Sequence, residues 1–176
     1  SDTFLAVFNS LNSEKKFITS LLTKIILDDI KKIDRKDKLY TAIIVEPRKH
    51  KALEFVLNNF TTNLDNNWLF VIYCSNFNKD YVIEIKNKLQ IDIEIIVITE
   101  CNLKINDYNL LLTNKIFYEV IPTEILLIFQ TDSMILKENK ENIHDFLQYD
   151  YVGAPWKNSK CCICCRKRWK CQCKCL

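Results

Sequence analysis

The sequence has almost no glycine: among 176 residues, Gly153 is the only one. Loops that wrap phosphate groups, such as the P-loop and the G-x-G-x-x-G turn, need several glycines, so both are excluded. If this chain binds phosphates, then side chains, a metal ion or a helix N-terminus must hold them. Long apolar runs are also lacking, and none approaches the ~20 residues of a membrane-spanning helix.

Several recognisable catalytic motifs are missing as well. His50 and His144 lie far apart, and H-E-x-x-H, G-x-S-x-G and C-x-x-C are absent from residues 1–156, which argues against hydrolytic zinc and serine-triad chemistry. Residues 1–16 have no long apolar core, so we expect no signal peptide. Cys74 and Cys101 are isolated thiols, which is typical of a reducing compartment, so we expect a cytoplasmic protein.

Apolar patterns predict strands that alternate with helices from residue 40 onward. Strands are predicted at 40–45, 68–73, 93–98, 125–129 and 149–152, and helices at 1–38, 51–62, 80–89, 102–121 (one or two) and 138–147. This alternation indicates an α/β, Rossmann-like fold with a mainly parallel sheet and helices on both faces. We expect an N-terminal helical extension (1–38), an α/β domain (39–156) and a tail (157–176).

The run at 125–129, Ile-Leu-Leu-Ile-Phe, is typical of a central strand buried on both faces. It ends abruptly in Gln130-Thr131-Asp132-Ser133. Since ligands of open α/β sheets bind beyond the carboxyl ends of the strands, we interpret Asp132 as functional. Its carboxylate and the neighbouring oxygen groups suit Mg²⁺ or Mn²⁺ beside a diphosphate. The alternative is that Asp132 and Ser133 merely cap a turn.

Two other polar clusters accompany predicted strands. After 40–45, Glu46 could accept hydrogen bonds from a base or ribose, and Arg48 could bind a phosphate or carboxylate with two parallel hydrogen bonds. Near 149–152, Asp150 lies between aromatic residues, and Tyr151 and Trp156 could stack on a sugar or base. The alternatives are a solvated turn for the first cluster and a closed core edge for the second.

Residues 157–176 form a tail with seven cysteines, seven basic residues and no acid. Dense thiols could bind zinc or copper, and a basic arm could bind nucleic acid. The spacing lacks the loops of a zinc finger, so we expect a disordered tail without a function of its own. The remaining residues carry 18 basic against 22 acidic side chains, a net charge of −4, which argues against broad nucleic-acid binding by the body.

Three blocks of sequence resemble those of one family. They are V-E-P-R-K-H at 45–50 with 53–59, F-Q-T-D-S at 129–133, and Y-D-Y-V-G-A-P-W at 149–156. The family is a domain of unknown function found in large DNA viruses and in microbes, and its members are similar to nucleotide-sugar glycosyltransferases of the GT-A type. The resemblance covers about residues 40–156, and a viral source would place the protein in the host cytoplasm or the virion.

The resemblance implies a GT-A-like domain that binds a nucleoside diphospho-sugar and transfers the sugar to an unknown acceptor. Asp132 would hold the divalent ion, although Gln130 replaces the first acid of the family's D-x-D motif. Asp150 would be the catalytic carboxylate on the acceptor side. The substrate-binding residues would be Glu46, Arg48, His50, Gln130, Tyr151 and Trp156.

The sequence departs from the family after Trp156, where similar proteins continue into the acceptor half. We therefore expect a truncated chain that could be inactive on its own. Two other functions remain open from sequence alone. One is a non-catalytic binding or scaffold domain, and the other is a metal-binding module that acts through the Cys-rich tail.

Overall fold

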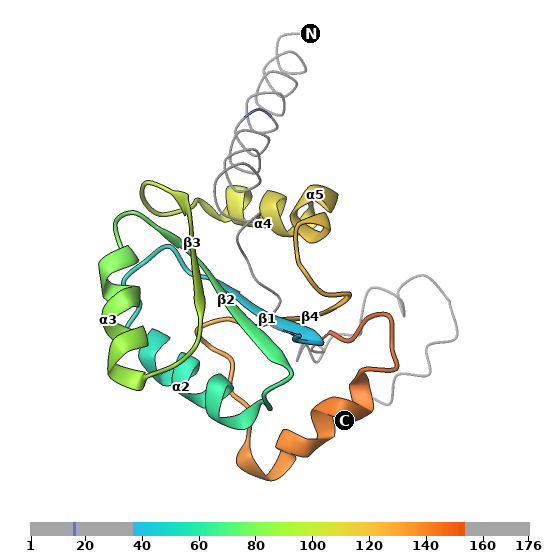
Figure 1. The fold of residues 1–176 in the computed structure, drawn as a ribbon. Helices are drawn as coiled ribbons and strands as arrows, with labels where there is room; N and C mark the ends of the chain where they lie inside the picture. The colour runs from blue at the N-terminus through green and yellow to red at the C-terminus, as the bar shows by residue number, and fades with distance from the viewer. Residues whose placement is uncertain (1–15, 17–36, 154–176) are drawn as a thin grey trace, which may run out of the picture. The chain divides into compact units, whose positions relative to one another are not determined.

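The computed structural model describes residue 16 and residues 37–153, without the side chains of 139–142 (Figure 1). The chain divides into two compact units, residues 1–141 and 142–176, and each is described by itself. The helix predicted over 1–38 and the tail lie almost wholly outside the described residues. The domain boundaries expected after residues 38 and 156 stay predictions.

Strands and helices alternate along the described part of the first unit. The order is β1 (Tyr40–Val45), α2 (Leu53–Asn63), β2 (Trp68–Ser75), α3 (Lys79–Leu89), β3 (Glu94–Thr99), α4 (Ile105–Thr113), α5 (Lys115–Glu119), β4 (Ile125–Ile128) and a 3₁₀ helix, Lys137–Phe146. The first four predicted strands are confirmed, and 102–121 holds two short helices. The strand predicted at 149–152 is wrong. All four of its side chains are exposed, so the segment has no buried face that would favour a strand.

The four strands form one parallel sheet in the order β3-β2-β1-β4. Tyr40 of β1 lies opposite Trp68 of β2 on one side and opposite Ile125 of β4 on the other. The first three strands therefore follow one another from β1 to the edge strand β3, and β4 is then added next to β1 on the side opposite β2. This reversal creates a topological switch point between β1 and β4, where open α/β sheets bind their ligands.

Helices cover both faces of the sheet, as predicted (Figure 1). The crossovers through α2 and α3 lie on one face, and α4 and α5 lie on the other. On the α4–α5 face, Leu111 and Phe117 pack in one cluster with Ile43 and Val71. On the other face, Phe60 of α2 stacks on Phe129 with ring centroids 4.0 Å apart. The observed α/β architecture thus agrees with the alternation in the sequence.

The position of β4 differs from the prediction. It was expected to be a central strand buried on both faces, but it lies at the edge of the described sheet and pairs with β1 alone there. Its residues Ile125 to Leu127 are only half-buried, and Ile128 is 37% exposed. The strand that is buried throughout is β2. A short apolar run does not by itself distinguish an edge strand from a central one.

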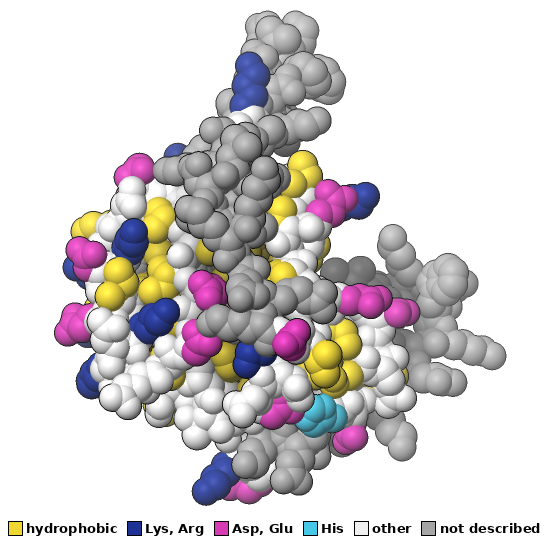
Figure 2. All heavy atoms as spheres, viewed as in Figure 1, with side chains coloured by type: hydrophobic (Ala, Val, Ile, Leu, Met, Phe, Trp, Pro, Cys, Tyr) yellow, Lys and Arg dark blue, Asp and Glu magenta, His cyan; other side chains and the backbone are white. Residues whose placement is uncertain are grey.

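Charges are mixed on the surface that Figure 2 shows. Among the described residues on this face, Lys and Arg side chains are interspersed with Asp and Glu, and apolar patches lie between them. Within the described part of the chain, no helix is long and apolar enough to cross a membrane.

Candidate functional site at the carboxyl edge of the sheet

Glu46 and Arg48 form a bidentate ion pair directly after β1. Arg48 donates from Nε to Glu46 Oε1 at 2.8 Å and from Nη2 to Oε2 at 2.9 Å, and its backbone N–H also donates to Oε1. The Glu46 side chain is 4% exposed and that of Arg48 is 55% exposed. Both carboxylate oxygens of Glu46 are therefore engaged by Arg48, and Glu46 orients the guanidinium. These hydrogen bonds raise the pKa of Arg48 above its ordinary value.

A buried pair of polar side chains holds the loop that carries Arg48. Asn78 is fully buried, and its Nδ2 donates to the backbone oxygens of Glu46 at 2.8 Å and of Arg48 at 2.9 Å. Its Oδ1 accepts the backbone N–H of Ser75, and Ser75 Oγ donates to the backbone oxygen of Pro47. Buried polar groups that are all paired fix one backbone conformation. The end of β2 and the start of α3 thus position the loop after β1.

Asp132 lies in a tight turn at the end of β4. Ser133 donates its N–H to the backbone oxygen of Gln130, whose own N–H donates to Ser133 Oγ. Asn59 of α2 then exchanges two hydrogen bonds with the backbone of Ile135, at 2.8 and 3.0 Å. The turn is therefore held from both sides. Asp132 itself is exposed, and no partner for its carboxylate is seen among the described residues.

Tyr108 of α4 lies beside the turn that follows β4. Its hydroxyl accepts a hydrogen bond from Gln130 Nε2 at 2.7 Å. Tyr108 also lies close enough to Arg48 to contribute to the raised pKa of the guanidinium. Tyr108 thus holds the Gln130–Ser133 turn by a hydrogen bond, and this turn and the Arg48 loop follow the neighbouring strands β4 and β1 at the switch point. Sequence reasoning assigned Tyr108 only to the apolar side of a helix, and it missed the roles of Asn59 and Asn78.

His50 accepts a hydrogen bond from the backbone just before α2. Its Nδ1 accepts the N–H of Ala52, and its backbone oxygen accepts the hydroxyl of Tyr81 at 3.2 Å. The imidazole is half-buried beside the exposed Lys49 and Lys51. In the described structure, His50 therefore shapes the loop that Arg48 projects from.

The remaining predicted site residues belong to the second unit. Asp150 and Tyr151 are exposed, and the Tyr151 ring lies against Gly153, where an added Cβ would come within 2.6 Å of the tyrosine hydroxyl. Trp156 lies outside the described residues. Their proposed contact with the sugar or acceptor stays a prediction.

A metal ion would find few ligands at this edge. Within residues 37–153, no group of three or more His, Cys, Asp and Glu side chains gathers to hold one. Asp132 offers a single carboxylate, and the amide of Gln130 is engaged with Tyr108. Mg²⁺ often binds through one or two carboxylates together with substrate phosphates and waters. The residues present thus suit a divalent ion only when a ligand brings phosphate oxygens.

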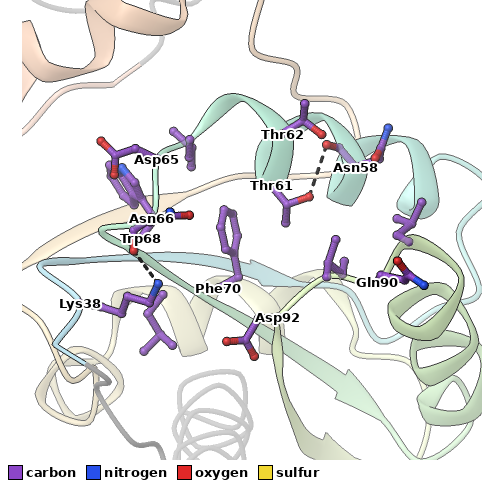
Figure 3. A pocket seen from close by; sticks show the side chains of 14 residues that line it. Lys38, Asn58, Thr61, Thr62, Asp65, Asn66, Trp68, Phe70, Gln90 and Asp92 are labelled. Atoms are coloured by element: carbon purple, nitrogen blue, oxygen red, sulfur yellow. Dashed lines mark hydrogen bonds between the residues drawn. The ribbon is translucent and has the colours of Figure 1, made fainter.

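A half-open cavity lies elsewhere. It opens at the amino-terminal edge of the strands, between the end of α2, the start of β2 and the end of α3 (Figure 3). None of the predicted site residues lines it. The candidate site at the carboxyl edge is thus an exposed cluster of oriented polar groups.

The fold defines the class of this protein, and comparison with known proteins gives one partial family match. The sheet order and the crossovers define a parallel, Rossmann-like α/β protein. Residues 92–174 match the family described as a protein of unknown function, DUF5672. The matched range includes the blocks at 129–133 and 149–156 but not the block at 45–50. It also continues into the tail as far as residue 174, whereas the sequence blocks led us to expect the family resemblance to end at Trp156. No curated protein and no solved structure gives a significant match.

Proposed function

We propose that the carboxyl edge of the sheet binds the diphosphate of a nucleoside diphospho-sugar, as in a glycosyltransferase-like protein. The observation that carries the proposal is the position of Arg48 and of the Gln130–Ser133 turn, which follow the neighbouring parallel strands β1 and β4 at the switch point. The resemblance of the three sequence blocks also favours it, whereas the partial family match names no function.

The diphosphate would be bound chiefly by Arg48. Glu46 engages Nε and Nη2 of the guanidinium, which leaves Nη1 of a half-exposed side chain to donate to phosphate oxygens. Lys49 and Lys51 add exposed positive charge to the same loop. A divalent ion held by Asp132 would supply further charge neutralisation of the leaving diphosphate. Asp150 would act as the acceptor-side carboxylate, with Tyr151 and Trp156 lining the sugar.

Titration calorimetry of the full chain tests this proposal. UDP, GDP, UDP-glucose and GDP-mannose are each added with and without Mn²⁺. We expect binding of at least one nucleotide, and we expect Arg48→Lys to weaken it about tenfold because lysine lacks the fork that pairs with Glu46. Asp132→Asn should remove any Mn²⁺ dependence, whereas the exposed control Glu138→Gln should not. Absence of heat with every nucleotide would refute the proposal.

A second candidate is a non-catalytic binding domain. It is favoured by the single carboxylate at the end of β4 and by the engagement of Gln130 with Tyr108. Nucleotide binding without release of free sugar or transfer to any acceptor would support it. The metal-binding function of the tail concerns residues outside the described range and stays a prediction. Zinc uptake that is unchanged after deletion of residues 157–176 would argue against it.

A further inference from the structure

The cavity at the amino-terminal edge is a second site, separate from the one around Arg48. It is about half open to solvent and has a volume of about 270 Å³. Strand β2 begins at the cavity with Trp68 and ends at Ser75, beside the loop that carries Arg48. Eight extended residues span about 23 Å, so one small molecule cannot reach both sites.

Neutral hydrogen-bonding groups make up much of the cavity wall. Figure 3 shows Phe70 pointing from β2 toward Thr61 and Asn58 on α2, with Gln90 on one side and Lys38 on the other. The wall also includes the amide of Asn66 and the carboxylates of Asp65 and Asp92. The lining thus contains two carboxylates and one ammonium group, and Lys38 already donates to the backbone oxygen of Asn66. This charge balance disfavours an anionic ligand such as a phosphate.

Trp68 lies beneath the surface of the cavity and carries an unpaired donor. The residue is 3% exposed, and its indole packs against Tyr40 with ring centroids 4.9 Å apart. Among the described residues, its Nε1 is a buried side-chain nitrogen without a hydrogen-bond acceptor. Such unpaired buried donors are rare in native proteins, and an ordered water is a usual partner for one that the protein leaves unpaired.

Gln90 occupies an unusual backbone position at the rim. It follows the last residue of α3 in the left-handed conformation, with φ 53°. Helices commonly place glycine at this point, because a side chain there carries a steric cost. Here the position carries an amide side chain that lines the cavity. Replacing Gln90 with glycine would therefore remove the amide while suiting the backbone.

We propose that this cavity binds a single neutral sugar ring. Its volume is just below the ~300 Å³ at which sites for drug-sized ligands begin, so one ring is an appropriate size. Amide, hydroxyl and carboxylate groups can pair with sugar hydroxyls, which act as both donors and acceptors. Phe70 and Trp68 are 7% and 3% exposed, so they form a buried apolar base beneath the polar groups, and the ring would be held chiefly by hydrogen bonds. The proposal does not depend on the transferase function.

Saturation-transfer NMR on the full chain tests it, with glucose, galactose, mannose, xylose and N-acetylglucosamine as probes. We expect at least one sugar to bind with millimolar affinity. Gln90→Gly should weaken that binding about fivefold or more while leaving the melting temperature unchanged or higher. The matched control is Asn87→Ala, an exposed substitution on α3 outside the cavity, which should leave binding unchanged.

Three results would overturn the proposal. They are the absence of saturation transfer from every sugar, equal binding by wild type and Gln90→Gly, and binding of spermidine or phosphate in place of any sugar. Since UDP and GDP bind at the other edge in the proposed function, a failure here leaves that proposal standing. Conversely, sugar binding that is unaffected by Arg48→Lys would separate the two sites.

Discussion

Asn78, the first residue before α3, donates its side-chain amide to the backbone oxygen of Glu46 at 2.8 Å. The two residues are 32 positions apart in the sequence, and both are buried. In the usual arrangement, an asparagine here would cap the helix that follows. Here no side-chain cap is formed, and the amide instead fixes the end of β1. The candidate site thus depends on a buried hydrogen bond between the residue that precedes α3 and the residue that follows β1.

This relationship predicts a large cost for Asn78→Ala. The change leaves the backbone oxygens of Glu46 and Arg48 without their buried donor and removes the acceptor for Ser75. Each buried group that loses its partner costs about 1–3 kcal/mol, so we expect unfolding free energy to fall by about 3 kcal/mol. Urea denaturation measures this change in unfolding free energy. Asn87→Ala, an exposed change on the same helix, is the control, and an equal loss in both variants would contradict the role of Asn78.

The stacked rings of Phe60 and Phe129 give a second prediction. Phe129 is 2% exposed and joins β4 to α2, so Phe129→Ala should create a cavity and cost about 4 kcal/mol. Phe55 lies on the same helix and is 58% exposed, so Phe55→Ala should cost about 0.5 kcal/mol or less. Thermal unfolding, monitored by circular dichroism, compares the stabilities of the two variants. Similar losses for both variants would mean that the stack does not anchor β4.

Sequence patterns predicted the first four strands well because β-branched runs such as Tyr40–Val45 are long enough to specify a buried parallel strand. They also placed Arg48 and Asp132 at the same edge of the sheet, since parallel strands share one carboxyl edge. The position of β4 could not be predicted in this way. Ile125–Ile128 is as apolar as a central strand, and its place at the edge depends on which strands pair beside it.

The contacts within the site were less predictable than its location. The bidentate pair of Glu46 and Arg48 uses residues two positions apart, and their sequence equally allows two independent ligand contacts. Tyr108 joins the site through a hydroxyl on a helix whose apolar spacing predicts core packing. The cavity beside Trp68 brings together the ends of α2 and α3, which only the packed structure places side by side.

The two described cysteines should differ sharply in reactivity. Cys74 is fully buried, and burial raises its pKa from 9.0 to about 11, whereas Cys101 is exposed. Since the thiolate is the reactive form, roughly one part in a thousand of Cys74 would be ionised at pH 8 even if a reagent could reach it. Iodoacetamide labelling with peptide mass spectrometry should modify Cys101 within minutes and Cys74 only after unfolding.

The same shift predicts a pH dependence. A thiol with a raised pKa in the folded state stabilises the fold fully below its ordinary pKa, and this stability is lost as the pH rises from about 9 through about 11. Burial also raises the pKa of Tyr73, which acts in the same direction. Unfolding free energy should therefore fall more between pH 8 and pH 11 in the wild type than in Cys74→Ala. An identical pH profile for the two proteins would contradict the assignment.

The contact between Tyr108 and Gln130 gives the last prediction. Tyr108→Phe removes the hydroxyl that accepts from Gln130 Nε2, and the turn that carries Asp132 loses its contact with α4. Because the bond lies near the surface, the loss of unfolding free energy should be about 1 kcal/mol or less, whereas amide exchange at Ser133 should accelerate several-fold. Tyr40→Phe is the matched control, because no hydrogen bond of the Tyr40 hydroxyl is seen among the described residues. Hydrogen–deuterium exchange with peptide resolution measures both variants. Unchanged exchange over residues 130–133 in Tyr108→Phe would show that Ser133 and Asn59 hold the turn without α4.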